Sequence, residues 1–106
     1  MNRMEKIWVC GASGRVGRKM IGELEKTGAE ILLTDMDSVD VTNSKDVMDY
    51  AGINRPHYII NSAGMTDVAA CEEQVELAYR VNALGARNLS VAARKIKARM
   101  VQLSTD

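Results

Sequence analysis

A short apolar run that ends directly at a glycine-rich turn constrains the fold more than any other feature of the sequence. The run covers residues 6–10 (Lys-Ile-Trp-Val-Cys) and is followed by glycines at 11, 14 and 17. A run this short is typical of a buried strand, because a helix needs more residues. Apolar side chains then recur at helical spacing up to Gly28, at Val16, Met20, Ile21 and Leu24. The sequence therefore predicts a strand, a tight turn and an amphipathic helix.

Three more strands are expected along the chain. Short apolar runs place them at residues 30–35, 57–61 and 100–104. Residues 37–42 are polar and turn-like, with valines interleaved at 39 and 41, and these valines predict a very short additional strand.

Two further helices are expected between these strands. The first follows a cap at Thr42 or Asn43 and ends before Pro56. The second runs from about 75 to 95, with an apolar stripe at Ala78, Val81, Gly85, Leu89, Ala92, Ala93 and Ile96. This alternation predicts an α/β fold, a Rossmann-like, doubly wound parallel sheet with helices on both faces. The 106 residues make one small domain, short for an enzyme that holds both a cofactor and a substrate.

The glycine turn has the composition of a phosphate-binding loop. Its first glycine permits a tight turn, Gly14 lets a phosphate approach the backbone, and Gly17 lets helix and strand pack closely. The helix that begins there offers unpaired N–H groups and the positive end of its dipole. We therefore expect residues 11–17 to bind the pyrophosphate of a nicotinamide cofactor; three turn glycines without a ligand are the alternative. A P-loop sequence is absent, which argues against an ATPase.

Asp35 stands at the end of the second expected strand, roughly 18 residues after the last glycine of the turn. An acidic residue at this distance binds the ribose hydroxyls of NAD in dinucleotide-binding folds. Met36 follows it, instead of an Arg or Lys that would receive a 2′-phosphate, so the sequence favours NAD over NADP. A carboxylate that only caps the adjacent loop is the alternative.

Two later segments contribute to the candidate site. Residues 61–64 (Asn-Ser-Ala-Gly) leave a strand at its carboxyl end, where ligands of open α/β sheets bind, and their small side chains leave room for a cofactor. A simple turn of small residues is the alternative there. Asn82 falls on the apolar stripe of the long helix, where its amide must find a backbone or water partner. The hydrogen bond of Asn82 can serve the function of the site, or it can be purely structural.

Composition argues against several other classes of protein. Lys plus Arg and Asp plus Glu both number 14, so no net field favours nucleic acid or an anionic membrane. The sequence lacks an apolar stretch of roughly 18 residues and a signal-peptide pattern. The two cysteines lie far apart, and the single His57 has no obvious partner, so a metal site and a hydrolase triad are not indicated. We expect a cytoplasmic protein without a metal.

Taken in order, the glycine turn, Asp35, the pair Asp40-Val41, residues 61–64, Asn82 and the closing Ser-Thr-Asp resemble the extended short-chain dehydrogenase/reductase superfamily. Within it, residues 77–89 (LAYRVNALGARNL) and the closing triplet look most like the dTDP-4-dehydrorhamnose reductases. The resemblance implies that residues 1–106 are the partial NAD(P)-binding Rossmann domain of an enzyme whose substrate domain is absent from this chain. That enzyme would reduce the 4-keto group of a nucleotide-linked sugar.

The resemblance also implies site residues. The cofactor-binding set, together with the residues expected above, is Gly11, Ser13, Gly14, Arg15, Val16, Gly17, Asp35, Asp40, Val41, Ser62, Ala63, Gly64, Met65 and Thr66. Within this set, residues 14–16 would line the pyrophosphate, Asp40 and Val41 would contact adenine, and residues 64–66 would line the nicotinamide. Thr105 would hydrogen-bond the substrate carbonyl, with Asp106 beside it in the substrate site. Asn82 matches the helix asparagine of the family's catalytic set.

Two departures from the family pattern matter. The family usually has an aromatic residue or His followed by Thr-Ala-Val-Asp-Lys-Ala-Glu. This chain instead has Met-Thr-Asp-Val-Ala-Ala-Cys-Glu at residues 65–72, which loosens the assignment of the sugar. The Tyr-x-x-x-Lys pair that supplies the proton in this family is expected beyond Asp106, so these residues alone should bind cofactor without turnover. Two alternatives remain, a sugar-nucleotide epimerase or dehydratase and a cofactor-sensing regulatory subunit. A truncated sheet would also expose apolar surface, which favours self-association.

Overall fold

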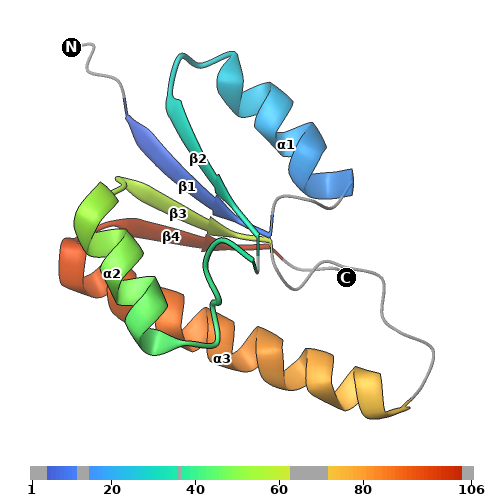
Figure 1. Ribbon diagram of the computed structural model, residues 1–106. Helices are drawn as coiled ribbons and strands as arrows, with labels where there is room; N and C mark the ends of the chain where they lie inside the picture. The colour runs from blue at the N-terminus through green and yellow to red at the C-terminus, as the bar shows by residue number, and fades with distance from the viewer. Residues whose placement is uncertain (1–4, 12–14, 36, 63–71, 104–106) are drawn as a thin grey trace.

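The computed structural model describes residues 5–11, 15–35, 37–62 and 72–103. These residues form an alternating series of strands and helices (Figure 1): β1 (Lys6–Cys10), α1 (Arg15–Glu25), β2 (Glu30–Thr34), α2 (Ser44–Asn54), β3 (Tyr58–Asn61), α3 (Glu72–Ile96) and β4 (Arg99–Gln102). Each element corresponds to one that the sequence predicts, and the bounds shift by a few residues. The α/β fold class is therefore confirmed.

The strands of the described residues form one parallel sheet in the order β2-β1-β3-β4. Strand β1 is central, with Trp8 in register with Leu32 of β2 on one side and Ile59 of β3 on the other. Helix α1 covers one face of the sheet, and α2 and α3 lie on the other (Figure 1). Because the strands are parallel, their carboxyl ends meet at one edge of the sheet, where ligands of such folds bind.

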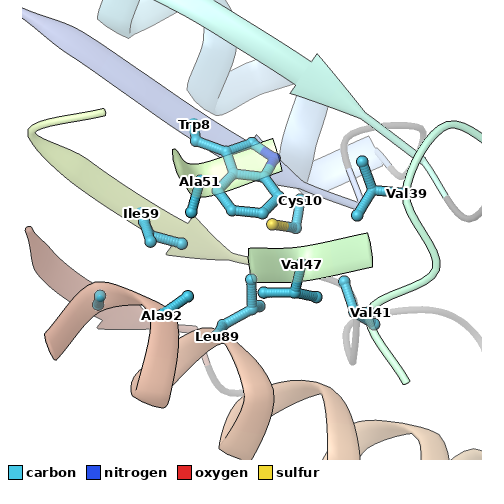
Figure 2. Packing of buried hydrophobic residues seen from close by; sticks show 10 residues of the cluster. Trp8, Cys10, Val39, Val41, Val47, Ala51, Ile59, Leu89 and Ala92 are labelled. Carbon is cyan, nitrogen blue, oxygen red and sulfur yellow. The ribbon is translucent and has the colours of Figure 1, made fainter. Parts of the chain in front are cut away.

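The larger core lies between the sheet and the two helices α2 and α3. Trp8, Cys10 and Ile59 point into it and are fully buried. Apolar side chains of the helices close it (Figure 2), among them Val47, Ala51, Leu89 and Ala92. The Trp8 ring lies 4.6 Å from that of Tyr50, and its Nε1 donates to Thr34 Oγ1 at 2.9 Å. The buried indole is thus satisfied at its polar atom as well as packed.

The smaller core lies between the sheet and α1. Ile7, Val9 and Ile60 are the strand residues that alternate with those of the larger core, and they face this side. Helix α1 packs on them through Met20, Ile21 and Leu24. Because both faces of the central strands are covered by helices, the strand sequences are continuously apolar rather than alternating with polar residues.

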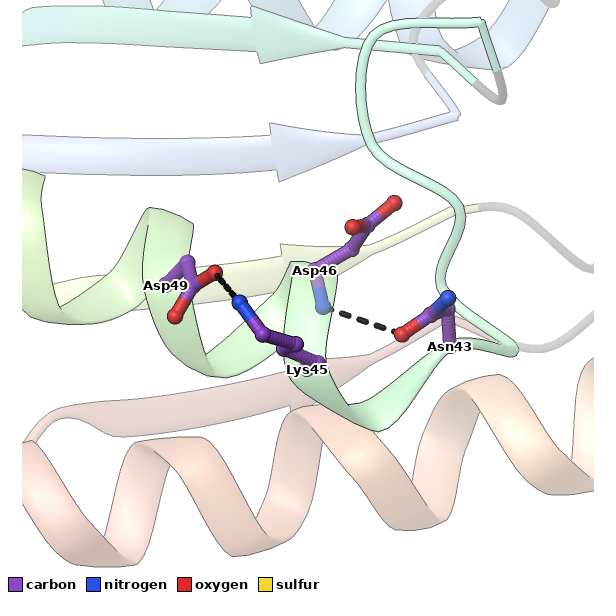
Figure 3. A network of polar contacts seen from close by, with 4 residues as sticks. All are labelled: Asn43, Lys45, Asp46 and Asp49. Atoms are coloured by element: carbon purple, nitrogen blue, oxygen red, sulfur yellow. Dashed lines mark hydrogen bonds and ion pairs between the residues drawn. The ribbon is translucent and has the colours of Figure 1, made fainter.

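Asn43 is the N-cap of α2, which resolves the choice between Thr42 and Asn43 as the capping residue. Its side-chain oxygen accepts a hydrogen bond from the N–H of Asp46 at 3.1 Å (Figure 3). In the first turn of the same helix, the exposed Lys45 Nζ lies 2.9 Å from a carboxylate oxygen of Asp49. The Asn43 bond satisfies an N–H group at the end of the helix. The Lys45–Asp49 ion pair is exposed and contributes little to stability.

The very short strand expected at Val39 and Val41 is absent, and that prediction is wrong. Residues 37–43 instead form turns. The carboxylates of Asp35 and Asp40 accept backbone N–H groups two or three residues ahead, which offers the backbone an alternative to pairing in a sheet. Both valines are buried in the larger core, where they anchor this loop between β2 and α2.

Candidate functional site

The turn that follows β1 leaves the sheet at its carboxyl edge. Gly11 has a left-handed φ of 75°, which a residue with a side chain rarely adopts. Its N–H donates to the carbonyl of Thr34, the last residue of β2, at 2.9 Å. The chain is thus turned at Gly11 while still bonded to the neighbouring strand. This is the conformational task that the sequence assigns to the first glycine.

Helix α1 starts after the turn with an N-terminus suited to an anion. Its first turn contains no acidic residue. A helix N-terminus carries unpaired N–H groups and a positive partial charge, and here no carboxylate from that first turn neutralises it. The backbone fits the phosphate-binding role. Arg15, Val16 and Gly17 are described as the start of this helix, but the surroundings of their side chains are not. Positions 12–14 lie outside the described residues.

Ser62 lies beside Gly11, at the carboxyl end of β3, and is 3% exposed. Its N–H donates to the carbonyl of Cys10 at 3.0 Å, which extends the pairing of β1 with β3. Its hydroxyl Oγ lies 2.6 Å from the same Cys10 oxygen and 3.1 Å from the carbonyl oxygen of Gly11. The hydroxyl is therefore directed at the backbone of β1 and of the glycine turn.

Asp35 follows β2 at the same edge of the sheet and is exposed. Its Oδ1 accepts hydrogen bonds from the N–H groups of Asp37 and Ser38 and from the Ser38 hydroxyl, each at 3.0 Å. The backbone and hydroxyl hydrogen bonds of Ser38 lower the pKa of this carboxyl below its usual value, so the group is charged. The loop-capping role considered for Asp35 is thus present. Its exposure leaves it accessible to a ligand.

Asp40 and Val41, the residues expected at adenine, differ in accessibility. Asp40 is partly buried, and its Oδ1 accepts from the N–H and hydroxyl of Thr42 at 2.9 and 2.6 Å. Val41 is 3% exposed, and its carbonyl accepts the side-chain amide of Asn88 at 2.8 Å. The Val41 side chain is therefore a core contact, and its predicted contact with adenine stays a prediction.

Asn82 does not occupy the buried position expected for it. It is exposed on α3, as are the neighbouring positions 79, 80, 83 and 84, whereas burial begins at Gly85. Helical periodicity does place Asn82 in line with Gly85, but among the described residues α2 and the sheet pack only against the second half of α3. The buried amide of this helix is Asn88, which the sequence analysis missed. Its partner, Val41, lies 47 positions away, and no local pattern signals it.

Asn61 is the other residue of the expected segment 61–64 that lies among the described residues. Asn61 is buried at the end of β3, and its Nδ2 donates to the Gln102 Oε1 of β4 at 2.9 Å. This contact ties together the carboxyl ends of the two strands. The other predicted site residues lie outside the described residues: Ser13, Gly14, Ala63, Gly64, Met65, Thr66, Thr105 and Asp106.

Other features of the described residues do not add to this site. His57 is exposed and its Nδ1 accepts the Lys6 N–H at 2.9 Å, so the ring does have a partner, at the opposite end of the sheet. A largely apolar groove of about 290 Å³ also opens at that end, between α1 and the sheet, and is lined by residues such as Ala29, Tyr58 and Val101. Within residues 5–11, 15–35, 37–62 and 72–103, no cluster of metal-ligating side chains and no helix able to cross a membrane is found.

Comparison with known proteins gives a consistent assignment. A family model described as the RmlD substrate binding domain matches residues 4–106. A dTDP-4-dehydrorhamnose reductase of Streptomyces griseus is 36% identical over 98 residues, which cover 92% of this chain and 32% of that protein. This chain spans about a third of the length of the curated relatives that it matches.

Solved structures show the same fold. The crystal structure of a dTDP-4-dehydrorhamnose reductase from Clostridium acetobutylicum superposes with a TM-score of 0.84 at 39% identity, covering 93% of this chain and 35% of that one. The dTDP-4-dehydrorhamnose reductase of Bacillus anthracis, solved in complex with NADP, gives a TM-score of 0.83 at 34% identity, with coverage of 94% and 36%. The similarity extends over nearly all of this chain.

Proposed function

Because the chain belongs to the RmlD substrate binding domain family, we propose that it forms the cofactor-binding part of a reductase that acts on a nucleotide-linked 4-keto sugar. The names of its relatives support this substrate class. In the proposed reaction, the bound nicotinamide cofactor supplies a hydride to the keto carbon. The residues of this chain bind and orient the cofactor.

The observation that carries the proposal is the arrangement at the carboxyl edge of the sheet. Two candidate features follow the adjacent strands β1 and β2. After β1 come the turn at Gly11 and the N-terminus of α1, whose first turn has no acidic residue, and after β2 comes the exposed carboxylate of Asp35. A dinucleotide needs a site for its pyrophosphate beside a site for its ribose, and these neighbouring features support the proposal that this edge provides both. A relative solved with NADP supports a nicotinamide cofactor.

We propose further that the cofactor is NAD in preference to NADP. The Asp35 carboxylate is held in place by three hydrogen bonds and is charged, so it would repel a 2′-phosphate and accept the hydroxyls of an unmodified ribose. The Bacillus anthracis relative was solved with NADP, so the proposed preference for NAD would be a difference between this chain and that relative.

The substrate side of the site is proposed from the resemblance. Thr105 would donate a hydrogen bond to the substrate carbonyl oxygen, with Asp106 adjacent and the exposed Asn82 available from α3. The sequence of 106 residues contains no Tyr-x-x-x-Lys, the pair that supplies the proton in this family. We therefore propose that these residues on their own bind the cofactor and do not reduce a sugar.

Calorimetric titration of NADH into the purified polypeptide tests the proposal. Gly14→Asp should abolish binding, because a carboxylate would stand where the pyrophosphate is expected. Gly22→Asp is the matched control, since Gly22 lies on α1 with no atom near the position of an added Cβ, and it should leave binding unchanged. Equal binding by the Gly14 variant and the parent would remove the glycine turn from the site.

A further inference from the structure

We propose that Ser62 is a positioning residue, whose hydroxyl holds the Gly11 carbonyl and so fixes the start of the glycine turn for the pyrophosphate. The proposal rests on the cofactor-binding function above. It also assigns Ser62 a different task from the direct cofactor contact that the sequence suggests.

Burial and distances show how the hydroxyl is used. Ser62 is 3% exposed, and its Oγ lies 2.6 Å from the Cys10 oxygen and 3.1 Å from the Gly11 oxygen. A serine hydroxyl has one proton to donate, so the two carbonyls share it. To donate a hydrogen bond to a cofactor, the hydroxyl would have to give up these bonds inside a buried site, which is unfavourable.

Gly11 is held from both sides of β1. Its N–H donates to Thr34 of β2 at 2.9 Å, and its carbonyl lies within hydrogen-bond distance of Ser62, after β3. The residue between these two contacts has a φ of 75° and no side chain that could fix it by packing. Hydrogen bonds are therefore what sets its orientation, and the peptide that leads into the phosphate-binding turn follows directly from it.

Removal of the Ser62 hydroxyl would affect the hydrogen bonding of the Cys10 and Gly11 carbonyls differently. The Cys10 oxygen also accepts the Ser62 N–H at 3.0 Å, so the pairing of β1 with β3 continues when the side chain is removed. Among the described residues, the Gly11 oxygen has the Ser62 hydroxyl as its hydrogen-bond donor. Removal of the hydroxyl should thus leave the sheet intact and release the turn.

The test compares three variants of the polypeptide. Ser62→Ala removes the hydroxyl, Ser62→Cys keeps the size of the side chain but is a weak donor, and Ser90→Ala is the matched control on the exposed side of α3. The readouts are the Kd of NADH, the Kd of adenosine, which lacks the pyrophosphate, and the thermal unfolding midpoint without ligand. A hydrogen bond of ordinary net strength corresponds to a change of about 3- to 10-fold in Kd.

We expect both Ser62 variants to bind NADH about 3- to 10-fold more weakly, to bind adenosine as the parent does, and to unfold within a few degrees of it. Parental NADH affinity in Ser62→Ala, parental affinity in Ser62→Cys, equal losses for both ligands, or loss of folding would each overturn the positioning role. If the parent itself fails to bind NADH, the proposed function falls and this inference falls with it, a result distinct from a failure confined to Ser62.

Discussion

The side-chain amide of Asn88 on α3 donates a hydrogen bond to the Val41 carbonyl, 2.8 Å away in the loop before α2. Both residues are buried, and the bond joins α3 to the loop between β2 and α2. It holds in place the loop that begins with Asp35. A residue that supports the candidate ribose site is thus far from it in sequence.

Asn88→Ala should lower the free energy of unfolding by about 1–3 kcal/mol, because it leaves the buried Val41 carbonyl without its donor. Asn82→Ala is the matched control on the same helix, and its exposed side chain predicts a change within about 0.5 kcal/mol. Urea unfolding of both variants measures the difference. Equal stabilities would show that the Asn88 bond contributes nothing.

Gly85→Ala should destabilise the protein by about 1–3 kcal/mol despite the better helix propensity of alanine. A Cβ at Gly85 would lie 2.8 Å from Cγ2 of Val41, which is buried and cannot move aside freely. Gly52→Ala on α2, where an added Cβ meets no atom within 4 Å, should instead stabilise by about 0.5–1 kcal/mol. Thermal unfolding should move the two midpoints in opposite directions, and a parallel shift would contradict the packing argument.

Asn43→Ala should cost about 0.5–2 kcal/mol, since the N–H of Asp46 loses the acceptor seen in Figure 3. Asn43→Ser restores a capping oxygen and should recover most of the loss. Lys45→Ala removes only the exposed pair with Asp49 and should leave stability close to that of the parent. Chemical unfolding that ranks Lys45→Ala as the most damaging change would reverse this assignment.

Cys10 should be unreactive in the folded protein, because burial raises the pKa of its thiol to about 12. In a Cys71→Ser background, iodoacetamide at pH 8 should modify Cys10 far more slowly in buffer than in urea, as followed by mass spectrometry. The unfolded thiol ionises near its ordinary pKa of 9.0 while the folded thiol stays neutral, so stability should fall as pH rises from about 9 to about 12. The corresponding slope should be smaller in Cys10→Ala, and identical slopes would count against the buried neutral thiol.

Asp35→Ala should weaken NADH binding more than NADPH binding, since the repulsion of a 2′-phosphate is lost together with the contact to ribose. Asp37→Ala is the control, because Asp37 is exposed and it is its backbone N–H that bonds to Asp35. The lowered pKa of Asp35 keeps this carboxylate charged throughout the range from about pH 5 to pH 8, so its contribution to NADH affinity should be constant there. Equal losses for the two cofactors would defeat the ribose assignment.

The sequence predicts the sheet and its helices well because the signals are local. The run before Gly11 and the cap at Asn43 each specify an element within a few residues. The direction of a buried hydroxyl or amide is a different matter, since it depends on which backbone lies opposite. The partner of Ser62 is 51 or 52 positions away and that of Asn88 is 47. Residue type alone indicates that these side chains need a hydrogen-bond partner, but it does not identify the backbone carbonyl that fills this role.

Asn82 shows a second limit. Helical periodicity identifies the face on which a residue lies, but burial also requires another element at that level of the helix. The first half of α3 extends past α2, and Asn82 on the predicted face is exposed there. The wrong expectation of a strand at Val39 and Val41 has a related origin, because alternating valines can anchor a loop as well as a strand.

The central position of β1 determines how this chain can acquire its structure. Its register with β3 pairs Ile7 with Tyr58, so the middle of the sheet closes only after synthesis has passed residue 61. Contacts across such separations close slowly, because a long loop must be ordered before they form. Until then the first strand presents an unpaired apolar edge, and we expect emerging chains to be most prone to misassociation during this interval.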